Sequence, residues 1–569
     1  MNPPPRITAR PPGPREAQLL IAAAQAVRTD KRLAEKLLRE YCQRVPQDPV
    51  GFFNLARLLG RDAGEAETLL RRAIALEPRF HEAWVNLANV LNERLDFAGA
   101  EAAWRSAIKL APESAVASLN LAHMLRKTGR LDEGLAEIER CLSLAPDSLQ
   151  TWCDQLMFLL YAEGLTPRAV ADAHRDVGRR IEEAAGSRPR PPARSLAGRR
   201  LRVGYVSADF RQHAIIAFLS AVISTRDRTA VEIFCYSMVE QEDDVTEALR
   251  RSVDGWTSIV GLDDETAARR VAADGIDVLV DLAGYSKGYR LGVFARRPAP
   301  VQGTWLGYPA TTGLERIDFR ISDAVADPPG VADALHSETV ARIDPIFLCF
   351  APPADADPVS PPPLSRLGRV TFGSFNNVSK LTPGVVESWT RILDSVPDST
   401  LLLKSSGDTD EPARRRILKL FGACGVGADR VRFFGRTATL ADHYRRYSEI
   451  DIALDPFPYN GTTTTSEALW MGVPVIALLG EEGHHVARVS ASILSAVGLP
   501  DLVATSRDDY VARAAALARD PARLAALREG MRARMAASPF MDAPGFARKL
   551  DSLYRAAHER VMAAQVVTP

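Results

Sequence analysis

A run of hydroxyl side chains at a predicted helix start is the part of this sequence best suited to bind a ligand. The stretch Asn460–Pro474 reads NGTTTTSEALWMGVP, in which four consecutive threonines follow a glycine. One such hydroxyl is enough to cap a helix, so the run calls for a further explanation. Gly461 lets the backbone approach a ligand closely, and threonine hydroxyls with the free amide groups of a helix start suit a diphosphate.

Glu467 extends this pattern toward a nucleotide. It falls in the first turn of the predicted helix. A carboxylate is repelled by phosphate there, but it can reach past the phosphates to both hydroxyls of a ribose. Threonines on the phosphates and Glu467 on the ribose describe a nucleoside diphosphate site. The structural alternative is an ordinary helix cap followed by an acid that favours the helix dipole.

Two further candidates stand where strands are predicted to end. Lys380, in FGSFNNVSKLTP, could set an ammonium group against a departing diphosphate. The alternative is a solvated surface lysine, which is more common. His213, in VGYVSADFRQH, could hydrogen-bond a sugar or acceptor hydroxyl or carry a proton, since imidazole titrates near neutral pH. A structural histidine is equally compatible with its spacing.

The elements that must position these residues are alternating strands and helices. Short runs rich in Val, Ile and Phe alternate with helical segments from Leu201 onward, and again after a proline-rich interruption over 351–368. Such alternation predicts two parallel, doubly wound sheets with the ligand cleft at the carboxyl ends of their strands. No GxGxxG follows the first strand of either half and no GxxxxGK[ST] occurs, which argues against dinucleotide and P-loop sites.

The N-terminal part carries a different signal, a repeat. Pro78, Pro112 and Pro146 close three similar phrases at intervals of 34 residues, and NLANVL returns as NLAHML. This is the period of tetratricopeptide repeats, helix-turn-helix units that stack into a curved solenoid. The concave face of such a solenoid binds extended peptides or partner proteins. By itself the repeat predicts a binding function and gives no indication of catalytic activity.

Composition narrows the class of protein. Lys plus Arg and Asp plus Glu each total 71, so the net charge does not indicate a nucleic acid or an anionic membrane surface as a partner. The six cysteines form no CxxC pair, no metal-ligand spacing is evident, and we expect neither a metal nor another cofactor. The tripeptide 408–410, DTD, superficially resembles a metal-binding motif, and we take it as chance. The absence of a signal peptide and of a membrane span predicts a cytoplasmic protein.

The predicted organisation is an all-α tetratricopeptide-repeat solenoid followed by an α/β region of two Rossmann-like, doubly wound lobes. The predicted segments are a disordered N-terminus (1–15), repeats (16–148), a helical linker (149–198), a first lobe (199–355), a second, nucleotide-binding lobe (366–540), and a C-terminal helix that returns to the first lobe (541–569).

The motifs, taken in order, resemble a known family. RLRVGYVSADFRQH, LVDLAGYSKG, RPAPVQGTWLGYPATTG, FNNVSKLTP and NGTTTTSEALWMGVP follow the repeats. Together they are similar to the O-linked N-acetylglucosamine transferases in their bacterial form. The resemblance covers residues from about 50 to 560. It implies an inverting GT-B glycosyltransferase that uses UDP-N-acetylglucosamine to modify Ser or Thr hydroxyls of proteins, with the acceptor along the repeat face.

The resemblance also implies roles for individual residues. Lys380 matches the lysine that stabilises the UDP leaving group, and His213 matches an active-site histidine near sugar and acceptor. The donor-binding positions implied in the same way are Thr463 and Thr464 for the pyrophosphate, with Thr462 beside them, Glu467 for the ribose, His443 stacking on the uracil, Asn377 where animal enzymes have Gln, and Leu306 and Gly307 in the sugar pocket.

Three departures from the animal pattern leave the donor sugar open. Thr462 replaces a histidine, Tyr459 replaces a cysteine near the acetyl group, and Leu440 stands where a uracil-facing lysine is expected. Related branches of the family use GDP-fucose or UDP-glucose, so these donors are alternatives. A repeat scaffold attached to a catalytically silent body is a further alternative, although the residues of the expected site are present.

Overall fold

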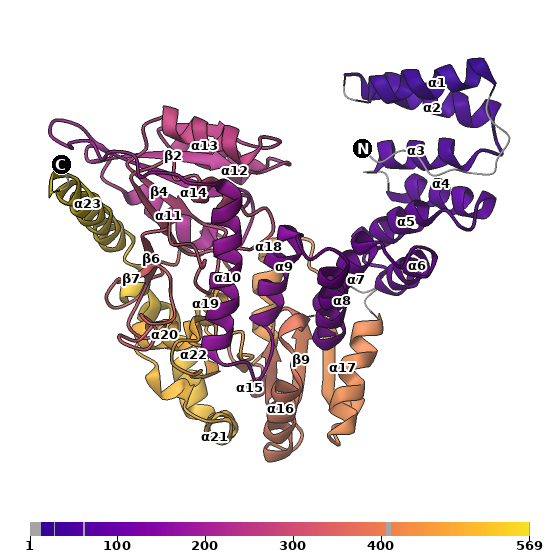
Figure 1. Ribbon diagram of the computed structural model, residues 1–569. Coiled ribbons are helices and arrows are strands. Elements are labelled where there is room, and N and C mark those ends of the chain that lie inside the picture. The colour runs from indigo at the N-terminus through magenta and orange to yellow at the C-terminus, as the bar shows by residue number, and fades with distance from the viewer. Residues whose placement is uncertain (1–12, 28, 61–62, 405–410, 568–569) are drawn as a thin grey trace. The chain divides into compact units, whose positions relative to one another are not determined.

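The computed structural model describes residues 13–27, 29–60, 63–404 and 411–567 (Figure 1). Most of the predicted disordered N-terminus and the whole DTD tripeptide, 408–410, lie outside these residues. The chain forms two compact units. One comprises residues 1–151 with 405–417, and the other comprises residues 152–404 with 418–569.

The first unit is built from pairs of helices. Consecutive helices pack as α1 with α2, α3 with α4, α5 with α6 and α7 with α8. Each of Pro78, Pro112 and Pro146 lies two residues beyond the end of a helix, because proline cannot continue one. Trp104 and Leu121 lie in the apolar core that joins neighbouring pairs. The helices are α1 Pro14–Ala26, α2 Lys31–Arg44, α3 Pro49–Leu59, α4 Ala63–Leu76, α5 His81–Glu93, α6 Phe97–Leu110, α7 Ala115–Lys127 and α8 Leu131–Leu144.

Two more helices, α9 Leu149–Leu159 and α10 Pro167–Ala185, follow the repeats. The α10 helix begins after Thr166, whose hydroxyl accepts a hydrogen bond from a backbone amide, and ends at Gly186 with φ 72°. Buried His174 on α10 forms a 2.7 Å hydrogen bond through Nε2 with the hydroxyl of Tyr308 in the first lobe. The helix is thereby fixed to the lobe that follows it.

The first lobe contains a seven-stranded sheet in the order β3-β2-β1-β4-β5-β6-β7, with all neighbours parallel. Strands β4, β5 and β6 are buried along their whole lengths, as expected for a parallel sheet covered on both faces. The strands are β1 Leu201–Ser207, β2 Val231–Ser237, β3 Gly255–Ser258, β4 Val278–Asp281, β5 Val301–Thr304, β6 Phe319–Ser322 and β7 Thr339–Arg342. The helices are α11 Ile216–Thr225, α12 Asp244–Ser252, α13 Asp264–Ala273 and α14 Leu291–Ala295.

The second lobe repeats this topology in a six-stranded sheet of order β10-β9-β8-β11-β12-β13, again all parallel. The strands are β8 Thr371–Ser374, β9 Thr400–Lys404, β10 Val431–Phe434, β11 Ile452–Leu454, β12 Val475–Leu478 and β13 Val503–Ala504. The helices, after α15 Leu364–Leu367, are α16 Pro383–Ser395, α17 Glu411–Ala423, α18 Leu440–Arg445, α19 Thr463–Trp470, α20 Val489–Ala496, α21 Arg507–Ala518 and α22 Pro521–Ala536. The first part of α17, residues 411–417, belongs to the first compact unit. Both lobes therefore have the doubly wound order predicted from the alternation of strands and helices.

Helix α23, Ala543–Val567, follows the second lobe but packs on the first. Its Tyr554 hydroxyl lies 3.2 Å from the Tyr205 hydroxyl of β1, and Phe546 stacks on Trp305. The polypeptide thus crosses between the lobes twice, once through residues 351–368 and once before α23.

Candidate active site

The order of the strands identifies where each lobe can hold a ligand. In a doubly wound sheet the ligand lies outside the carboxyl ends of the strands, where the winding changes direction. In the second lobe that point lies between β8 and β11. The chain leaving β8 forms the 3₁₀ turn Val378–Lys380, and the chain leaving β11 runs through Asp455 to the threonine run.

Lys380 lies at this point with its ammonium group among neutral oxygens. Nζ donates hydrogen bonds of 3.0 Å to Asn376 Oδ1 and 2.7 Å to the backbone oxygen of Asn460. It also lies 4.4 Å from the ring centroid of Tyr459. None of these three contacts is with a carboxylate, so none of them neutralises the ammonium.

The carboxylate that acts on Lys380 is that of Asp455, the first residue after β11. Burial lowers the pKa of Lys380 to about 8, and the Asp455 charge partly offsets this effect. Burial likewise raises the pKa of Asp455 to about 7. One Asp455 oxygen accepts the Gly461 amide at 2.8 Å, while Oδ2 is buried without a hydrogen-bond partner in the described chain. The pair is poised to change charge near neutral pH.

The hydroxyls of the threonine run divide into two groups. The Thr465 hydroxyl is buried against Ser490 at 2.9 Å, and Ser466 bonds back to the Thr462 backbone oxygen, so these two hold the turn together. The Thr464 hydroxyl donates to Asn376 Oδ1 at 3.0 Å, beside Lys380. The hydroxyls of Thr462 and Thr463 make no hydrogen bond within the described residues.

The structure does not support the alternative interpretation of the threonine run as an ordinary helix cap. Thr462 occupies the N-cap position of α19 and makes no side-chain capping bond. Gly461 is required by close packing, since a Cβ there would lie 2.5 Å from the Thr464 hydroxyl and 2.8 Å from Asp455. The first turn of α19 thus presents free amides and hydroxyls on the same side as Lys380.

Glu467 lies deeper in α19 than predicted. The helix begins at Thr463, which makes Glu467 its fifth residue, so the expectation that it lies in the first turn is wrong. The side chain is buried, and its Oε2 accepts hydrogen bonds of 3.1 Å from both Tyr447 and Nε2 of His443. The second oxygen, Oε1, has no protein partner within the described chain.

His443, on α18, lies in an aromatic cluster next to this carboxylate. Its ring is 6.0 Å from that of Phe375 and 5.6 Å from that of Tyr447, and its Nδ1 is buried without a described partner. The structure therefore brings His443 and Glu467 together, although 24 positions separate them in sequence.

Asn377 acts on the backbone of the Lys380 turn. The residue is exposed, and its Oδ1 accepts from the amide and hydroxyl of Ser379 at 3.0 and 2.8 Å. This contact caps the 3₁₀ turn that carries Lys380. In the described structure Asn377 is thus a positioning residue.

Leu306 and Gly307 lie in the first lobe, directly after β5. Leu306 has the left-handed value φ 73°, which is uncommon for a residue with a branched side chain. A Cβ on Gly307 would lie 1.8 Å from the Leu282 backbone oxygen, so only glycine fits against the end of β4. Such a constrained backbone at the carboxyl ends of strands is common where a ligand is clamped.

His213 lies in the loop between β1 and α11, at the switch point of the first sheet. Its side chain is 39 % exposed, with Nδ1 3.6 Å from Asp209 Oδ2. Within the described part of the chain no hydrogen bond or ion pair joins His213 to Lys380. The structure brings Lys380, Thr464, His443 and Glu467 into the second lobe and leaves His213, Leu306 and Gly307 on the first.

Sequence reasoning missed several residues of this site. Asp455 directly follows β11, Lys404 ends β9, and Asn376 is the second residue after β8. These positions at strand ends are the signal that could have identified them. Lys404 is a second cation near Glu467, and burial lowers its pKa while the Glu467 charge partly offsets this effect. Tyr447 was missed because nothing local marks it.

Two searches of the described residues gave no candidates. No cluster of three or more His, Cys, Asp or Glu in them could hold a metal ion. No helix in the described chain has the length and apolar character needed to cross a membrane.

Comparison with known proteins assigns the chain to a family. The profile described as glycosyl transferase family 41 matches residues 187–349 and 367–550, and a tetratricopeptide-repeat profile matches 115–148. A tomato protein (Solanum lycopersicum) named probable UDP-N-acetylglucosamine–peptide N-acetylglucosaminyltransferase SPINDLY is 39 % identical over 74 % of this chain and 45 % of its own length. The SEC protein of Arabidopsis thaliana, with the same enzyme name, is 30 % identical over 64 % of this chain and 38 % of its own.

A solved structure extends the likeness to the whole chain. A mutant of the Thermobaculum terrenum O-GlcNAc transferase superposes with a TM-score of 0.85 and 31 % identity, covering 97 % of this chain and all of that one. The chain spans less than half the length of the curated SPINDLY and SEC relatives. The repeats, the two doubly wound lobes and these matches together show that the chain belongs to glycosyl transferase family 41.

Proposed function

We propose that the chain is an inverting glycosyltransferase that moves N-acetylglucosamine from UDP-N-acetylglucosamine to Ser or Thr hydroxyls of proteins, without a metal ion. The observation that carries this proposal is the buried ammonium of Lys380, held beside the first turn of α19 at the switch point of the second lobe. Family membership and the names of the relatives support the same activity.

The donor would lie along the carboxyl edge of the second sheet. The diphosphate would take the free amides of α19 and the hydroxyls of Thr463 and Thr464, exchanging with the contacts that Asn376 now makes. Glu467 would offer Oε1 to the ribose while His443 and Tyr447 hold Oε2. A uracil would then stack on the imidazole of His443.

The reaction would be a single displacement at the anomeric carbon. The acceptor oxygen forms the new C–O bond as the bond to the β-phosphate breaks, and negative charge develops on the departing UDP. Lys380 and the helix start of α19 stabilise that charge, which removes the need for a divalent cation. Leu306 and Gly307 would line the sugar, and His213, the donor phosphate or a chain of waters would take the acceptor proton.

The acceptor would be a protein segment bound by the helical repeats. In the first unit the Asn120 amide donates to Asn89 at 3.1 Å, so adjacent repeats present side-chain amides that can bind a peptide backbone. All six cysteines are free thiols, which supports a reducing, cytoplasmic location. The likeness to the Thermobaculum terrenum enzyme over 97 % of the chain supports assignment to the bacterial form of the family.

Two observations favour keeping a second class of donor as an alternative. The SPINDLY-named relatives are 38–40 % identical to this chain, whereas the SEC protein is 30 % identical to it. The chain is therefore more similar to the SPINDLY branch than to the SEC branch of the family. Leu440, where a uracil-facing lysine is expected, is 43 % exposed and offers no charge to a base. GDP-fucose, and less directly UDP-glucose, are therefore the competing donors.

Calorimetric titration with UDP, GDP and UDP-N-acetylglucosamine, with and without EDTA, tests the proposal. We expect metal-independent binding of the uridine ligands and a large loss in Lys380→Ala, with unchanged circular dichroism. Preference for GDP would replace the donor, and absence of any nucleotide binding would favour the catalytically silent scaffold. Transfer at the wild-type rate by Lys380→Ala would remove its proposed role.

A further inference from the structure

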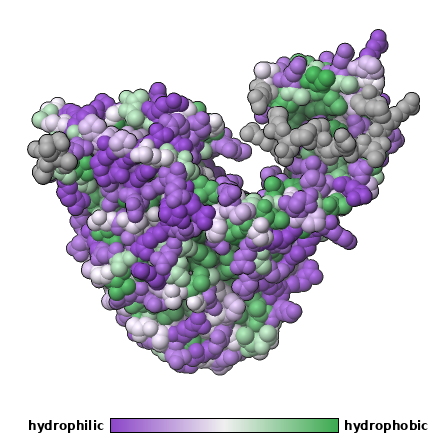
Figure 2. Space-filling view, in the orientation of Figure 1, coloured by the Kyte–Doolittle hydropathy of each residue, from purple (hydrophilic) through white to green (hydrophobic). Residues whose placement is uncertain are grey.

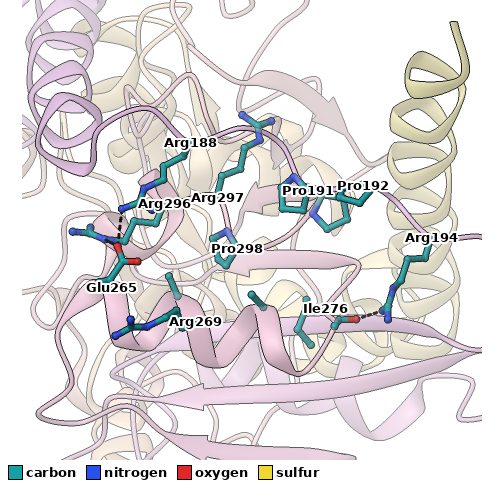
Figure 3. Close-up of a pocket in the computed structure, with 14 residues that line it drawn as sticks. Arg188, Pro191, Pro192, Arg194, Glu265, Arg269, Ile276, Arg296, Arg297 and Pro298 are labelled. Atoms are coloured by element: carbon teal, nitrogen blue, oxygen red, sulfur yellow. Dashed lines mark hydrogen bonds and ion pairs between the residues drawn. The ribbon is translucent and has the colours of Figure 1, made fainter. Parts of the chain in front are cut away.

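A pocket of about 340 Å³ lies on the first lobe (Figure 3). Gly275 and Ile276 precede β4, and Pro298 and Pro300 precede β5, so the pocket lies at the amino ends of these strands. His213 follows the carboxyl end of β1 in the same parallel sheet. The pocket and His213 are therefore at opposite edges of the first sheet.

The lining of this pocket is strongly basic. Among its 14 residues Glu265 is the single acid, and five are arginines: Arg188, Arg194, Arg269, Arg296 and Arg297. Figure 2 shows mainly hydrophilic side chains over the face of the lobe that carries α13. The remaining walls are apolar and come from prolines, alanines and Ile276. Such a surface suits an anion that also carries a non-polar part.

Neighbouring carboxylates do not balance these arginines. Glu265 is shared by Arg188 at 2.7 Å and Arg296 at 3.0 Å, and both ion pairs lie at one end of the pocket in Figure 3. Asp318 is likewise shared by Arg190 at 2.6 Å and Arg297 at 2.8 Å. Each of these carboxylates therefore faces two guanidinium groups.

Of the remaining two arginines of the lining, Arg194 also shares its carboxylate, whereas Arg269 has none among the described residues. Arg194 donates to the Gly275 backbone oxygen and shares Asp277, at 3.4 Å, with Arg199 at 2.6 Å. Arg269 makes one hydrogen bond, of 3.3 Å, to the Thr266 hydroxyl, and no ion pair within the described chain. An excess of positive charge therefore remains around the pocket.

Arg297 contributes a donor that has no partner. Its side chain is 9 % exposed, and its Nε is buried without a hydrogen bond in the described structure. Its backbone is in the left-handed region, at φ 51°. Burial lowers its pKa, while Asp318 and Glu182 partly offset this effect. A buried, unpaired guanidinium N–H costs free energy, so Asp318 does not fully satisfy the guanidinium of Arg297.

We propose that this arginine-lined pocket binds a small organic phosphate. Guanidinium groups match phosphate oxygens with two parallel N–H donors, and a phosphate at neutral pH brings more charge than a single carboxylate. The volume is at the lower end of the range for small-molecule sites, which fits a compact ligand rather than a folded partner. The proposal does not depend on which nucleotide sugar the chain uses.

The site also has a consequence for the segment that joins α10 to β1. Pro191, Pro192 and Arg194 form one wall, so a bound phosphate would tie this segment to α13. Hydrogen exchange of residues 187–197 and 268–276 would then slow when the ligand binds.

Calorimetric titration with inorganic pyrophosphate, at low ionic strength and with the donor site saturated with UDP, tests the proposal. We expect one additional binding event that weakens at least 10-fold in Arg269→Gln. That side chain is exposed and forms no ion pair in the described chain, so its loss should not affect folding. Arg251→Gln is the control, because Arg251 is an exposed arginine of α12 outside the pocket and has the same charge.

Hydrogen exchange locates the binding even if UDP does not saturate the other site. Pyrophosphate should protect residues 187–197 and 268–276 in wild type and in Arg251→Gln, and should protect them less in Arg269→Gln. No second binding event, or equal weakening in Arg251→Gln, would overturn the proposal. Equal or tighter binding of citrate would overturn the choice of phosphate as the ligand class.

Discussion

Replacing Asp455 with asparagine tests the electrostatics of the proposed leaving-group site. Asp455 is the acid that raises the pKa of Lys380 against the effect of burial, which leaves that pKa at about 8. An opposite charge at close range shifts a pKa by about 1–3 units, so Asp455→Asn should lower the Lys380 pKa by at least about one unit. The asparagine oxygen can still accept the Gly461 amide, so the loop should keep its conformation.

The expected loss depends on pH. With a pKa of about 8, Lys380 is about half protonated at pH 8 and about nine-tenths protonated at pH 7. After a shift of about one unit, the charged fraction falls about fivefold at pH 8 and less than twofold at pH 7. Because the charged amine is proposed to stabilise the leaving group, transfer should fall by the same factors, and the alkaline limb should move to lower pH.

The assay is a pH profile of kcat/KM between pH 6 and 9.5, with thermal unfolding measured in parallel. Lys380→Arg is the control, because a guanidinium stays charged across this range and should abolish the alkaline limb. An alkaline limb in Asp455→Asn at the wild-type pH would refute the coupling. A loss of activity of equal size at every pH would show that the substitution acts on structure instead.

Three further predictions concern packing, phosphate binding and metals. Gly307→Ala should destabilise the protein by several kcal/mol in thermal unfolding, because the new Cβ would clash with the Leu282 backbone, whereas Gly530→Ala, with nothing within 4 Å, should be neutral or slightly stabilising; equal effects would contradict the packing. Thr464→Val should weaken UDP binding by about 1 kcal/mol in calorimetry, while Thr465→Val should lower the melting temperature more than the affinity; the reverse pattern would show that the division of the threonine run is wrong. EDTA should leave transfer unchanged, and restoration of lost activity by Mg²⁺ or Mn²⁺ would refute the metal-free mechanism.

The sequence predicted the elements whose signals are local. The repeat prolines lie just past helix ends because the residue itself forbids helix continuation, so their 34-residue period was sufficient evidence. Most strands of both sheets were also expected, because strands buried on both faces are nearly continuous apolar runs, but the short strands β3, β6, β7 and β13 were not identified. The doubly wound, parallel arrangement predicted from the alternation of strands and helices agrees with both observed sheets.

The sequence alone could not identify the residue at which α19 begins. Each threonine in the run is an acceptable N-cap, so propensity does not choose among them. The structure begins the helix at Thr463, and Glu467 moves from the first turn to the second. A shift of one residue at a helix start turns a side chain by about 100°, which decides what a carboxylate can reach.

Local sequence patterns could not predict which residues contact one another within the site. Lys380 meets the Asn460 backbone across 80 positions, and His443 meets Glu467 across 24. Such contacts depend on which strands are neighbours and how the loops after them pack. Asp455 is the instructive case, because it follows a buried strand, as a site residue should, yet its effect on Lys380 depends on burial that only the folded chain supplies.

The return of α23 to the first lobe has a consequence for biosynthesis. Tyr205 of β1 pairs with Tyr554 of α23, a separation of 349 residues. At a synthesis rate of about 5–20 residues per second, β1 leaves the ribosome roughly 20–70 s before its partner helix exists. During that interval the apolar surface around Tyr205 and Trp305 has no cover, so nascent chains of this protein should depend on chaperones, and truncation before α23 should yield aggregated product.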